Sequence, residues 1–342
     1  MDLQLTEEQT LLREAVSELL ERLAGDDGLA RADAGDALWR ELVGFGALEV
    51  GQDLGAVELA LIAWSLGARL AAVPYVDSAA FAYVAPGHGR TALCLSEPGR
   101  SFAPAEPSAS FDGDSVTGEK NAVAFAAAVD SLAVTAGGAS GIALVLVKHG
   151  GSGVSIEPEA TLDPSLLPAH VRFDEADAEL LADGHDAAAL IESLAAVAGV
   201  LAAAEAVGAA AAVFDLACTY AAQRRQFGHT IGSFQALRHL LADLYVHLES
   251  SWSSVLYAAA ALDEREPDAL RTASIAKAYA GRATHEVAHG ALQVFGGVAF
   301  TAEHPAHRFL RRIAARRGQF GTPQEHEQRL GRSLAHRLEV LA

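Results

Sequence analysis

Two adjacent arginines stand out in an otherwise acidic chain. Arg224 and Arg225 come directly before a Gln-Phe-Gly step, in a segment (residues 220–244) that contains the Gly228–Gly232 loop between two helical patterns. One explanation is a solvated helix end, because cations near a helix C-terminus interact favourably with the helix dipole. The other is an anionic ligand, since an arginine fork matches a pyrophosphate and Phe227 adds a flat apolar surface. The segment alone leaves both explanations open.

A glycine pair further along the chain offers a second candidate binding element. Gly296 and Gly297 interrupt a long helical pattern. A plain helix cap followed by a turn explains such a pair. Close approach of the backbone to a ligand explains it equally well.

A third motif, His285-Glu286-Val287-Ala288-His289, has the spacing of zinc metallohydrolases, which places two imidazoles on one face of a helix. A catalytic zinc also needs a third protein ligand, and no histidine follows at the spacing of the metzincin class. We therefore interpret this motif as part of an ordinary helix. The His304–His307 pair receives the same interpretation, and we expect no metal site.

The elements that must position these residues form three blocks. The first is helical and opens with a capping box, Thr6 followed by Gln9. The second, from about Thr91 to Asp183, consists of short strand patterns separated by turn signals. The third returns to long helices. We predict a mainly α protein with a middle β-domain, divided into residues 1–88, 89–184 and 185–342.

Composition narrows the class of protein. The 342 residues carry a formal net charge of −19, which argues against a nucleic-acid surface. Cys94 and Cys218 make no disulfide framework, so the cytoplasm is the expected location. The alanine-rich segment 193–218 contains Glu205 and Asp215, and we interpret it as a buried helix in a close-packed bundle rather than a membrane span.

Four segments, taken together, resemble the acyl-CoA dehydrogenase family over nearly the whole chain. They are LTEEQTLLREAV, LSEPG, YAAQRRQFGHTIGSFQALRHLLADL and QVFGGVAFTAEHPAHRFLRR, and they stand in family order. The resemblance implies an N-terminal helical domain, a middle β-domain and a C-terminal four-helix domain. It also implies FAD as cofactor and oxidation of an acyl-CoA thioester to the enoyl-CoA, in which a carboxylate removes the α-proton and the β-hydride passes to the flavin.

The resemblance assigns cofactor-binding roles to two groups of residues. Both groups serve the FAD of a neighbouring subunit, so an oligomer is expected. The first group grips the cofactor from the loop between two helices: Arg224, Gln226, Phe227, Ile231, Phe234 and Gln235. The second receives its adenine and pyrophosphate end: Gln293, Gly296 and Gly297.

The chain departs from the family where the catalytic base belongs. The usual Glu-Gly-Thr step reads Phe320-Gly321-Thr322, and the alternative base position on the preceding long helix holds Ala198. Neither side chain can accept a proton. The aromatic and hydroxyl residues that normally face the flavin are replaced by Ala122, Val123 and Ala124. Three residues survive as candidate flavin or ribitol contacts: Ser96, Thr322 and Gln324.

These departures lead to the hypothesis of a subunit without a base in a heteromeric (α2β2) acyl-CoA dehydrogenase. The family contains such assemblies with half the usual FAD, including actinobacterial ones that act on steroid side-chain CoA esters. The expected partners are an acyl-CoA, a second dehydrogenase-like subunit and an acceptor of the electron-transfer flavoprotein type, with no nucleic acid and no membrane.

Other interpretations stay open. A shift of a few residues in the alignment brings Glu325 or Glu327 into consideration as the base of a self-sufficient enzyme. Glu205 lies about two helical turns, or roughly 10 Å, beyond the alternative base position, which is too far for a simple substitute. A paralogue without catalytic activity is a further alternative. A basic run offers a candidate surface for the CoA moiety, and the alternative is a solvated helix face or an interface: Arg311, Arg312, Arg316 and Arg317.

Overall fold

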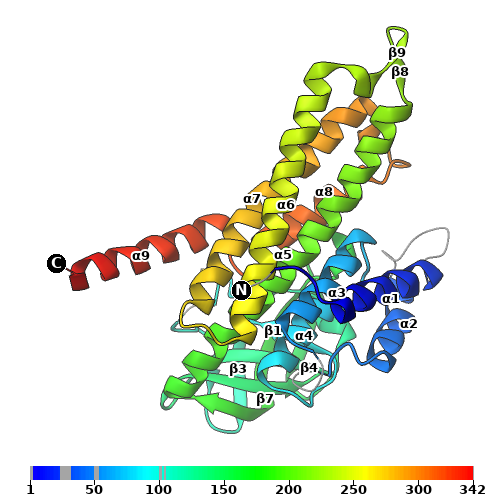
Figure 1. Ribbon diagram of the computed structural model, residues 1–342. Helices are drawn as coiled ribbons and strands as arrows, with labels where there is room; N and C mark the ends of the chain where they lie inside the picture. Colours follow the sequence, from blue (N-terminus) through cyan, green and yellow to red (C-terminus); the bar gives the residue numbers. More distant parts are fainter. Residues whose placement is uncertain (1–2, 24–31, 50–53, 100–101, 104, 342) are drawn as a thin grey trace. The chain divides into compact units, whose positions relative to one another are not determined.

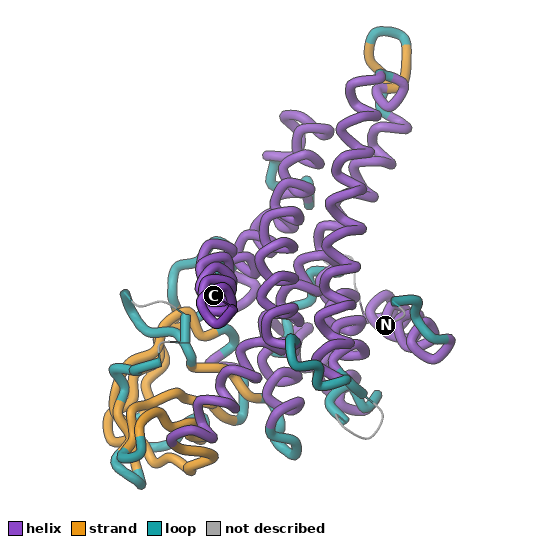
Figure 2. The backbone as a smooth tube through the Cα atoms, turned by 60° about the vertical axis from the view of Figure 1, so that its left-hand side comes forward, coloured by secondary structure: helices purple, strands orange, loops and turns teal. Residues whose placement is uncertain are grey.

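The computed structural model describes residues 3–23, 32–49, 54–99, 102–103 and 105–341. The chain divides into two compact units, each assembled from separate stretches of sequence (Figure 1). The helical unit comprises residues 1–30, 56–71 and 199–342, and the sheet unit comprises residues 31–55 and 72–198. The strands between residues 91 and 183 lie together in the sheet unit, whereas the two short strands at residues 225–226 and 229–230 lie in a hairpin of the helical unit (Figure 2).

The helical unit is built from α1, α3, most of α5, and α6 to α9. Pairs that pack against each other include α1 with α3, α6 with α7, and α7 with both α8 and α9. Their bounds are α1 Glu7–Leu23, α3 Ala56–Ala68, α5 Gly184–Gln223, α6 Gln235–Asp263, α7 Ala269–Phe295, α8 Ala306–Gly318 and α9 Pro323–Leu341. The predicted capping box starts α1: the Gln9 amide N–H donates to Thr6 Oγ1 at 3.1 Å, and the Thr6 N–H donates to Gln9 Oε1 at 3.0 Å.

The sheet unit contains α2, α4, the first turns of α5 and a mixed sheet. Neighbouring strands pair in the order β1-β4-β2-β3-β7-β5, and β6 pairs with β7. Because β4 also pairs with β5, the strands from β4 to β5 close a ring. The bounds are α2 Ala32–Gly44, α4 Tyr75–Val84, β1 Thr91–Cys94, β2 Ser110–Phe111, β3 Ser115–Val123, β4 Ser131–Gly138, β5 Gly141–Lys148, β6 Val154–Pro158 and β7 Ala169–Asp183. The mainly α fold with a middle β region is confirmed. The domain boundaries at residues 88 and 184 stay predictions.

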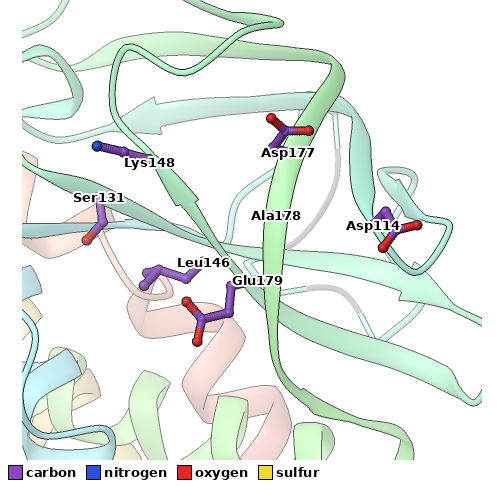
Figure 3. Close-up of a pocket in the computed structure, with 7 residues that line it drawn as sticks. All are labelled: Asp114, Ser131, Leu146, Lys148, Asp177, Ala178 and Glu179. Atoms are coloured by element: carbon purple, nitrogen blue, oxygen red, sulfur yellow. The ribbon is translucent and has the colours of Figure 1, made fainter.

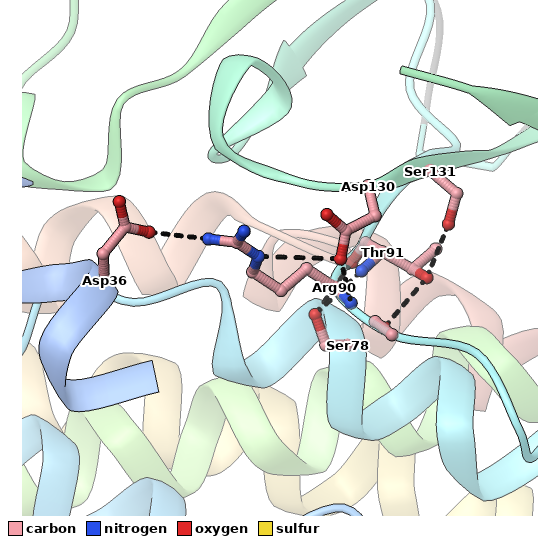
Figure 4. Close-up of polar contacts among 7 residues, drawn as sticks. Asp36, Ser78, Arg90, Thr91, Asp130 and Ser131 are labelled. Atoms are coloured by element: carbon pink, nitrogen blue, oxygen red, sulfur yellow. Dashed lines mark hydrogen bonds and ion pairs between the residues drawn. The ribbon is translucent and has the colours of Figure 1, made fainter. Parts of the chain in front are cut away.

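Polar contacts tie α2 and α4 to the sheet (Figure 4). Arg90 Nη1 donates to Asp36 Oδ1 on α2 at 2.6 Å, and the Arg90 N–H donates to Asp130 Oδ2 at 3.2 Å. On α4, Ser78 Oγ accepts the Thr91 N–H at 3.0 Å. These contacts satisfy the backbone where β1 begins.

The alanine-rich segment 193–218 lies within α5, and the burial of this helix explains why it is so apolar. It is long and apolar enough to cross a membrane, with a mean hydropathy of 2.0 in its most apolar window, but 67% of that window is buried inside the protein. Its neighbour α3 approaches closely, because a Cβ atom at Gly208 would lie 1.9 Å from the Trp64 carbonyl oxygen. Small residues permit this contact, which agrees with a core helix in a close-packed bundle.

Candidate cofactor and substrate site

The two arginines lie at the start of the hairpin that joins α5 to α6, and this hairpin is at the top of Figure 1. Two short strands, β8 (Arg225–Gln226) and β9 (His229–Thr230), pair across a turn, and a 3₁₀ turn (Ile231–Ser233) leads into α6. Gly228 has a φ of +81°, a conformation that glycine adopts without strain. Arg225 Nη2 donates to the Gly228 carbonyl at 2.9 Å, and Arg224 and Gln226 on either side of it are also exposed.

The hairpin exposes aromatic surface. The Phe227 side chain is 89% exposed and Phe234 is 39% exposed, and their rings meet edge to face with centroids 6.3 Å apart. Exposed aromatic surface of this kind usually marks a binding surface. The structure therefore brings together, in one short hairpin, the first group of predicted FAD contacts: Arg224, Gln226, Phe227, Ile231, Phe234 and Gln235.

The second predicted group lies at the C-terminal end of α7. Gln293 is exposed on the last turn, and Gly296, with a φ of +68°, ends the helix. Apart from the neighbouring backbone, no heavy atom of the described residues lies within 4 Å of a Cβ position built at Gly296 or Gly297, so this backbone is open to a ligand. The Tyr220 ring, near the end of α5, packs against the Phe295 ring, with ring centroids 5.4 Å apart. The two predicted groups are thus at the same end of the helical unit.

Phe320 occupies the turn between α8 and α9. It is 4% exposed and has a φ of +58°, an unfavourable conformation for an aromatic residue that costs roughly 1–3 kcal/mol. His326 Nε2 lies 3.0 Å from the Phe320 carbonyl oxygen. Burial lowers the pKa of His326 to about 4, so its ring is neutral at pH 7 and Nε2 must carry the proton that it donates. The turn is held in place although its side chain cannot act as a base.

A buried lysine supports the same turn from α7. Lys277 is 1% exposed, and its Nζ donates to the carbonyls of Arg316 at 2.8 Å and Arg317 at 3.1 Å. These carbonyls belong to the last turn of α8, where helix carbonyls lack intrahelical partners. Burial, and then the charges of Arg316 and Arg317, lower the pKa of Lys277 to about 7.

The alternative carboxylates are engaged in structural contacts. Glu325 Oε2 accepts from the Thr322 N–H at 2.8 Å and from Thr322 Oγ1 at 2.9 Å, which caps α9. Glu327 pairs with Arg282 on α7. Thr322 is thus part of a helix cap, whereas Gln324 is exposed on the first turn of α9.

Glu205 is also occupied. Its two carboxylate oxygens receive Arg312 Nη1 at 2.8 Å and Arg316 Nη2 at 2.7 Å, and all three side chains are buried. This ion triad corrects the interpretation of the basic run on α8. Arg312 and Arg316 point into the protein, so they form neither a surface for CoA nor a solvated helix face.

In the sheet unit, Ser96 follows β1, and its carbonyl accepts the Asn121 N–H at 3.1 Å. The neighbouring Glu97 and Lys120 form a fully buried ion pair at 2.7 Å. Burial alone would raise the pKa of Glu97, but hydrogen bonds from Lys120 and Ser108 lower it to about 2. The pair therefore fixes the backbone next to Ser96. Ala122, Val123 and Ala124 offer no hydroxyl or aromatic ring at the end of β3.

The sheet unit also has a hollow of about 440 Å³ on its surface (Figure 3). Its lining comes from β4, β5, β7 and the turn before β3, and it consists of Asp114, Ser131, Leu146, Lys148, Asp177, Ala178 and Glu179. None of the predicted site residues lies in this hollow. Its acidic rim does not match the anionic cofactor or a CoA ester.

The fold and these sites can be compared with known proteins. Residues 189–335 match the family model "Acyl-CoA dehydrogenase, C-terminal domain". The acyl-CoA dehydrogenase IpdE2 of Mycobacterium tuberculosis is 30% identical over 341 residues, covering 95% of this chain and 96% of the relative. The chain belongs to the acyl-CoA dehydrogenase family. The predicted resemblance and the predicted fold are therefore confirmed.

Two solved structures of this family are similar over nearly their whole length. One is a chain of a variant of the Tcur3481–Tcur3483 steroid acyl-CoA dehydrogenase, with 26% identity, a TM-score of 0.89, and coverage of 97% of this chain and 99% of that one. The other is a chain of the ChsE4–ChsE5 complex from Mycobacterium tuberculosis, with 26% identity, a TM-score of 0.84, and coverage of 98% and 99%.

Sequence reasoning missed the groups that hold the site in place. Glu97 belongs to the LSEPG segment that carries the family resemblance, but its pairing with Lys120 could not be read from the sequence. Arg312 and Arg316 are spaced four residues apart, which places them on one helix face and could have indicated a shared acidic partner. For the H-E-x-x-H motif, the described part of the chain contains no group of three side chains that could hold a metal ion.

Proposed function

We propose that this chain is a component of an FAD-dependent acyl-CoA dehydrogenase and that it lacks the catalytic base of the reaction. The enzyme removes the α-proton and the β-hydride of an acyl-CoA thioester and releases the α,β-unsaturated thioester. The base comes from a second, dehydrogenase-like subunit in an α2β2 assembly. A lipid or steroid acyl-CoA is the proposed substrate class, and the cytoplasm is the proposed location.

One observation carries the proposal: the turn that should supply a carboxylate supplies Phe320. The carboxylates closest to it in sequence, Glu325 and Glu327, are engaged in a helix cap and an ion pair. Freeing either of them would cost that contact. Ala198, at the alternative position, is fully buried and has no titratable group.

The residues present fit an FAD that is shared with another subunit. Arg224 would offer its guanidinium to the pyrophosphate, and Phe227 would cover an apolar part of the cofactor. The open backbone at Gly296 and Gly297 would admit the adenine and pyrophosphate end. Bound FAD supplies the acceptor for the β-hydride, and an acceptor of the electron-transfer flavoprotein type would reoxidise it.

The partner is supported by what this chain retains and lacks. The retained motifs reach outward: Phe227 is 89% exposed and Phe300, which follows the glycine pair, is 76% exposed. The missing groups are those that would face the flavin ring and the substrate within one subunit. Chains of two heteromeric dehydrogenases share the fold at 26% identity, which agrees with a partner for this chain as well.

The test compares this chain alone with this chain co-expressed with the dehydrogenase-like product of a neighbouring gene. We expect a colourless protein alone, and a yellow complex with one FAD per pair of unlike chains that dehydrogenates an acyl-CoA. Substituting the partner's carboxylate should abolish turnover, whereas Glu325→Gln and Glu327→Gln in this chain should not. Full flavin content and full activity of this chain alone would refute the proposal.

A further inference from the structure

Helix α7 carries a pair of histidines that the proposed function does not use. His285 and His289 lie one turn apart on one face of the helix, with Nε2 atoms 3.3 Å apart. Their ring centroids are separated by 4.4 Å and the ring planes meet at 65°, so the rings meet edge to face rather than stacked. His289 is exposed and His285 is half-buried, so the pair is accessible from solvent.

The separation of the two nitrogens matches a metal chelate. With zinc–nitrogen bonds of about 2.0–2.1 Å and a tetrahedral angle of about 109°, two ligand nitrogens lie roughly 3.3–3.4 Å apart. A right-angled arrangement with the same bond lengths would bring them to about 2.9 Å. Without a metal, the observed distance also allows one ring to donate a hydrogen bond to the other. A metal ion bound to both Nε2 atoms would take the place of that shared proton, and each neutral ring would carry its proton on Nδ1.

The charge of the chain is compatible with a cation ligand. Its formal net charge of −19 favours the approach of cations to this protein. The imidazoles bind such an ion in their neutral form.

We propose that His285 and His289 bind one divalent transition-metal ion of the zinc class in an open, two-histidine site. The remaining coordination positions are left to water or to a group from another chain. The site differs from a zinc hydrolase centre, because no group of three suitable ligands occurs within the described residues. The inference is independent of the dehydrogenase function.

The experiment is a calorimetric titration of the metal-free full chain with zinc chloride at neutral pH, using protein without a polyhistidine tag. We expect binding of one zinc ion per chain. His285→Gln and His289→Gln should each weaken zinc binding at least about tenfold, because each removes one of two ligands. His239→Gln, which changes an exposed histidine on α6, should bind zinc as the wild type does. Magnesium should not compete, since it prefers oxygen ligands.

Circular dichroism of each variant checks that the helices are intact before zinc is added. Absence of stoichiometric zinc binding to the wild type would overturn the proposal. So would folded His285→Gln or His289→Gln protein that binds zinc as tightly as the His239→Gln control.

Discussion

The buried ion triad provides a sharp test of what holds the helical unit together. Glu205 on α5 gives one carboxylate oxygen to Arg312 and the other to Arg316, at 2.8 and 2.7 Å, and the side chains of both arginines are at most 1% exposed. Glu205→Gln keeps the size of the side chain but removes its charge. The amide oxygen can still accept from one guanidinium, but the amide nitrogen then faces the other guanidinium, and both groups are donors.

The expected cost follows from this geometry. Arginine does not lose its proton, so two buried cations remain with no anion between them. Removing one partner of a buried pair typically costs about 3–5 kcal/mol. Typical free energies of unfolding are about 5–15 kcal/mol, so the loss is a large fraction of the total. Arg312 Nη1 also donates to the Ala71 carbonyl at 3.0 Å, a contact that the substitution leaves in place.

Urea unfolding, followed by circular dichroism, measures the change. Asp215→Asn is the matched control, because it removes the same charge from an exposed position on the same helix and should cost less than about 0.5 kcal/mol. Replacing Glu205, Arg312 and Arg316 together by methionine should recover most of the loss, since an apolar set leaves no buried charge. If Glu205→Gln unfolds at the same urea concentration as Asp215→Asn, our account of the triad is wrong.

Three further predictions concern the pH dependence, the close contact of α3 with α5, and the exposed hairpin. Folding lowers the pKa of Lys277 to about 7. Between pH 7 and about 10, this lysine therefore holds its proton in the unfolded chain but loses it in the folded protein. The free energy of unfolding should therefore rise with pH, by at most about 1.4 kcal/mol per unit, and Lys277→Met should flatten that slope in urea titrations from pH 7 to 9. Gly208→Ala should lower the melting temperature because its Cβ would lie 1.9 Å from the Trp64 carbonyl, whereas Gly331→Ala, in open space on α9, should stabilise by roughly 0.5–1 kcal/mol. Phe227→Ser should reduce the FAD content of the purified complex while leaving the melting temperature of this chain alone unchanged, because the ring is exposed there.

Much of the fold could be predicted because its signals are local. The capping box at Thr6 and Gln9 depends on residues three apart, and the order of helices, strands and helices depends on periodicity. The grouping of the elements could not be predicted. Helices α1 and α3 join the C-terminal helices in one unit, whereas α2 and α4 join the sheet. Periodicity marks which face of a helix is buried but does not say what covers it.

In the candidate site, too, local features could be predicted from the sequence and contacts between distant residues could not. The loop at Gly228–Gly232 could be predicted because its residues are adjacent in sequence, whereas the two short strands around it could not. The role of Glu205 required contacts across more than a hundred residues, to Arg312 and Arg316 on α8. A single sequence contains the three residues but not the distances between them. Their burial also reversed the interpretation of the basic run, since charged residues are rarely buried unless they are paired.

The contacts around Phe320 bear on why a subunit without a base would keep this turn. Lys277 holds the end of α8, His326 holds the Phe320 carbonyl, and Glu325 caps α9. The first two contacts are made to backbone carbonyls and the third caps α9. None of them requires a carboxylate at position 320. A glutamate could therefore be absent from this position without any loss of the turn itself. The strained φ of Phe320 persists because these neighbours determine it. The geometry of the turn is thus maintained by structural contacts that are separable from any proton transfer, which agrees with the proposal that a partner subunit supplies the base.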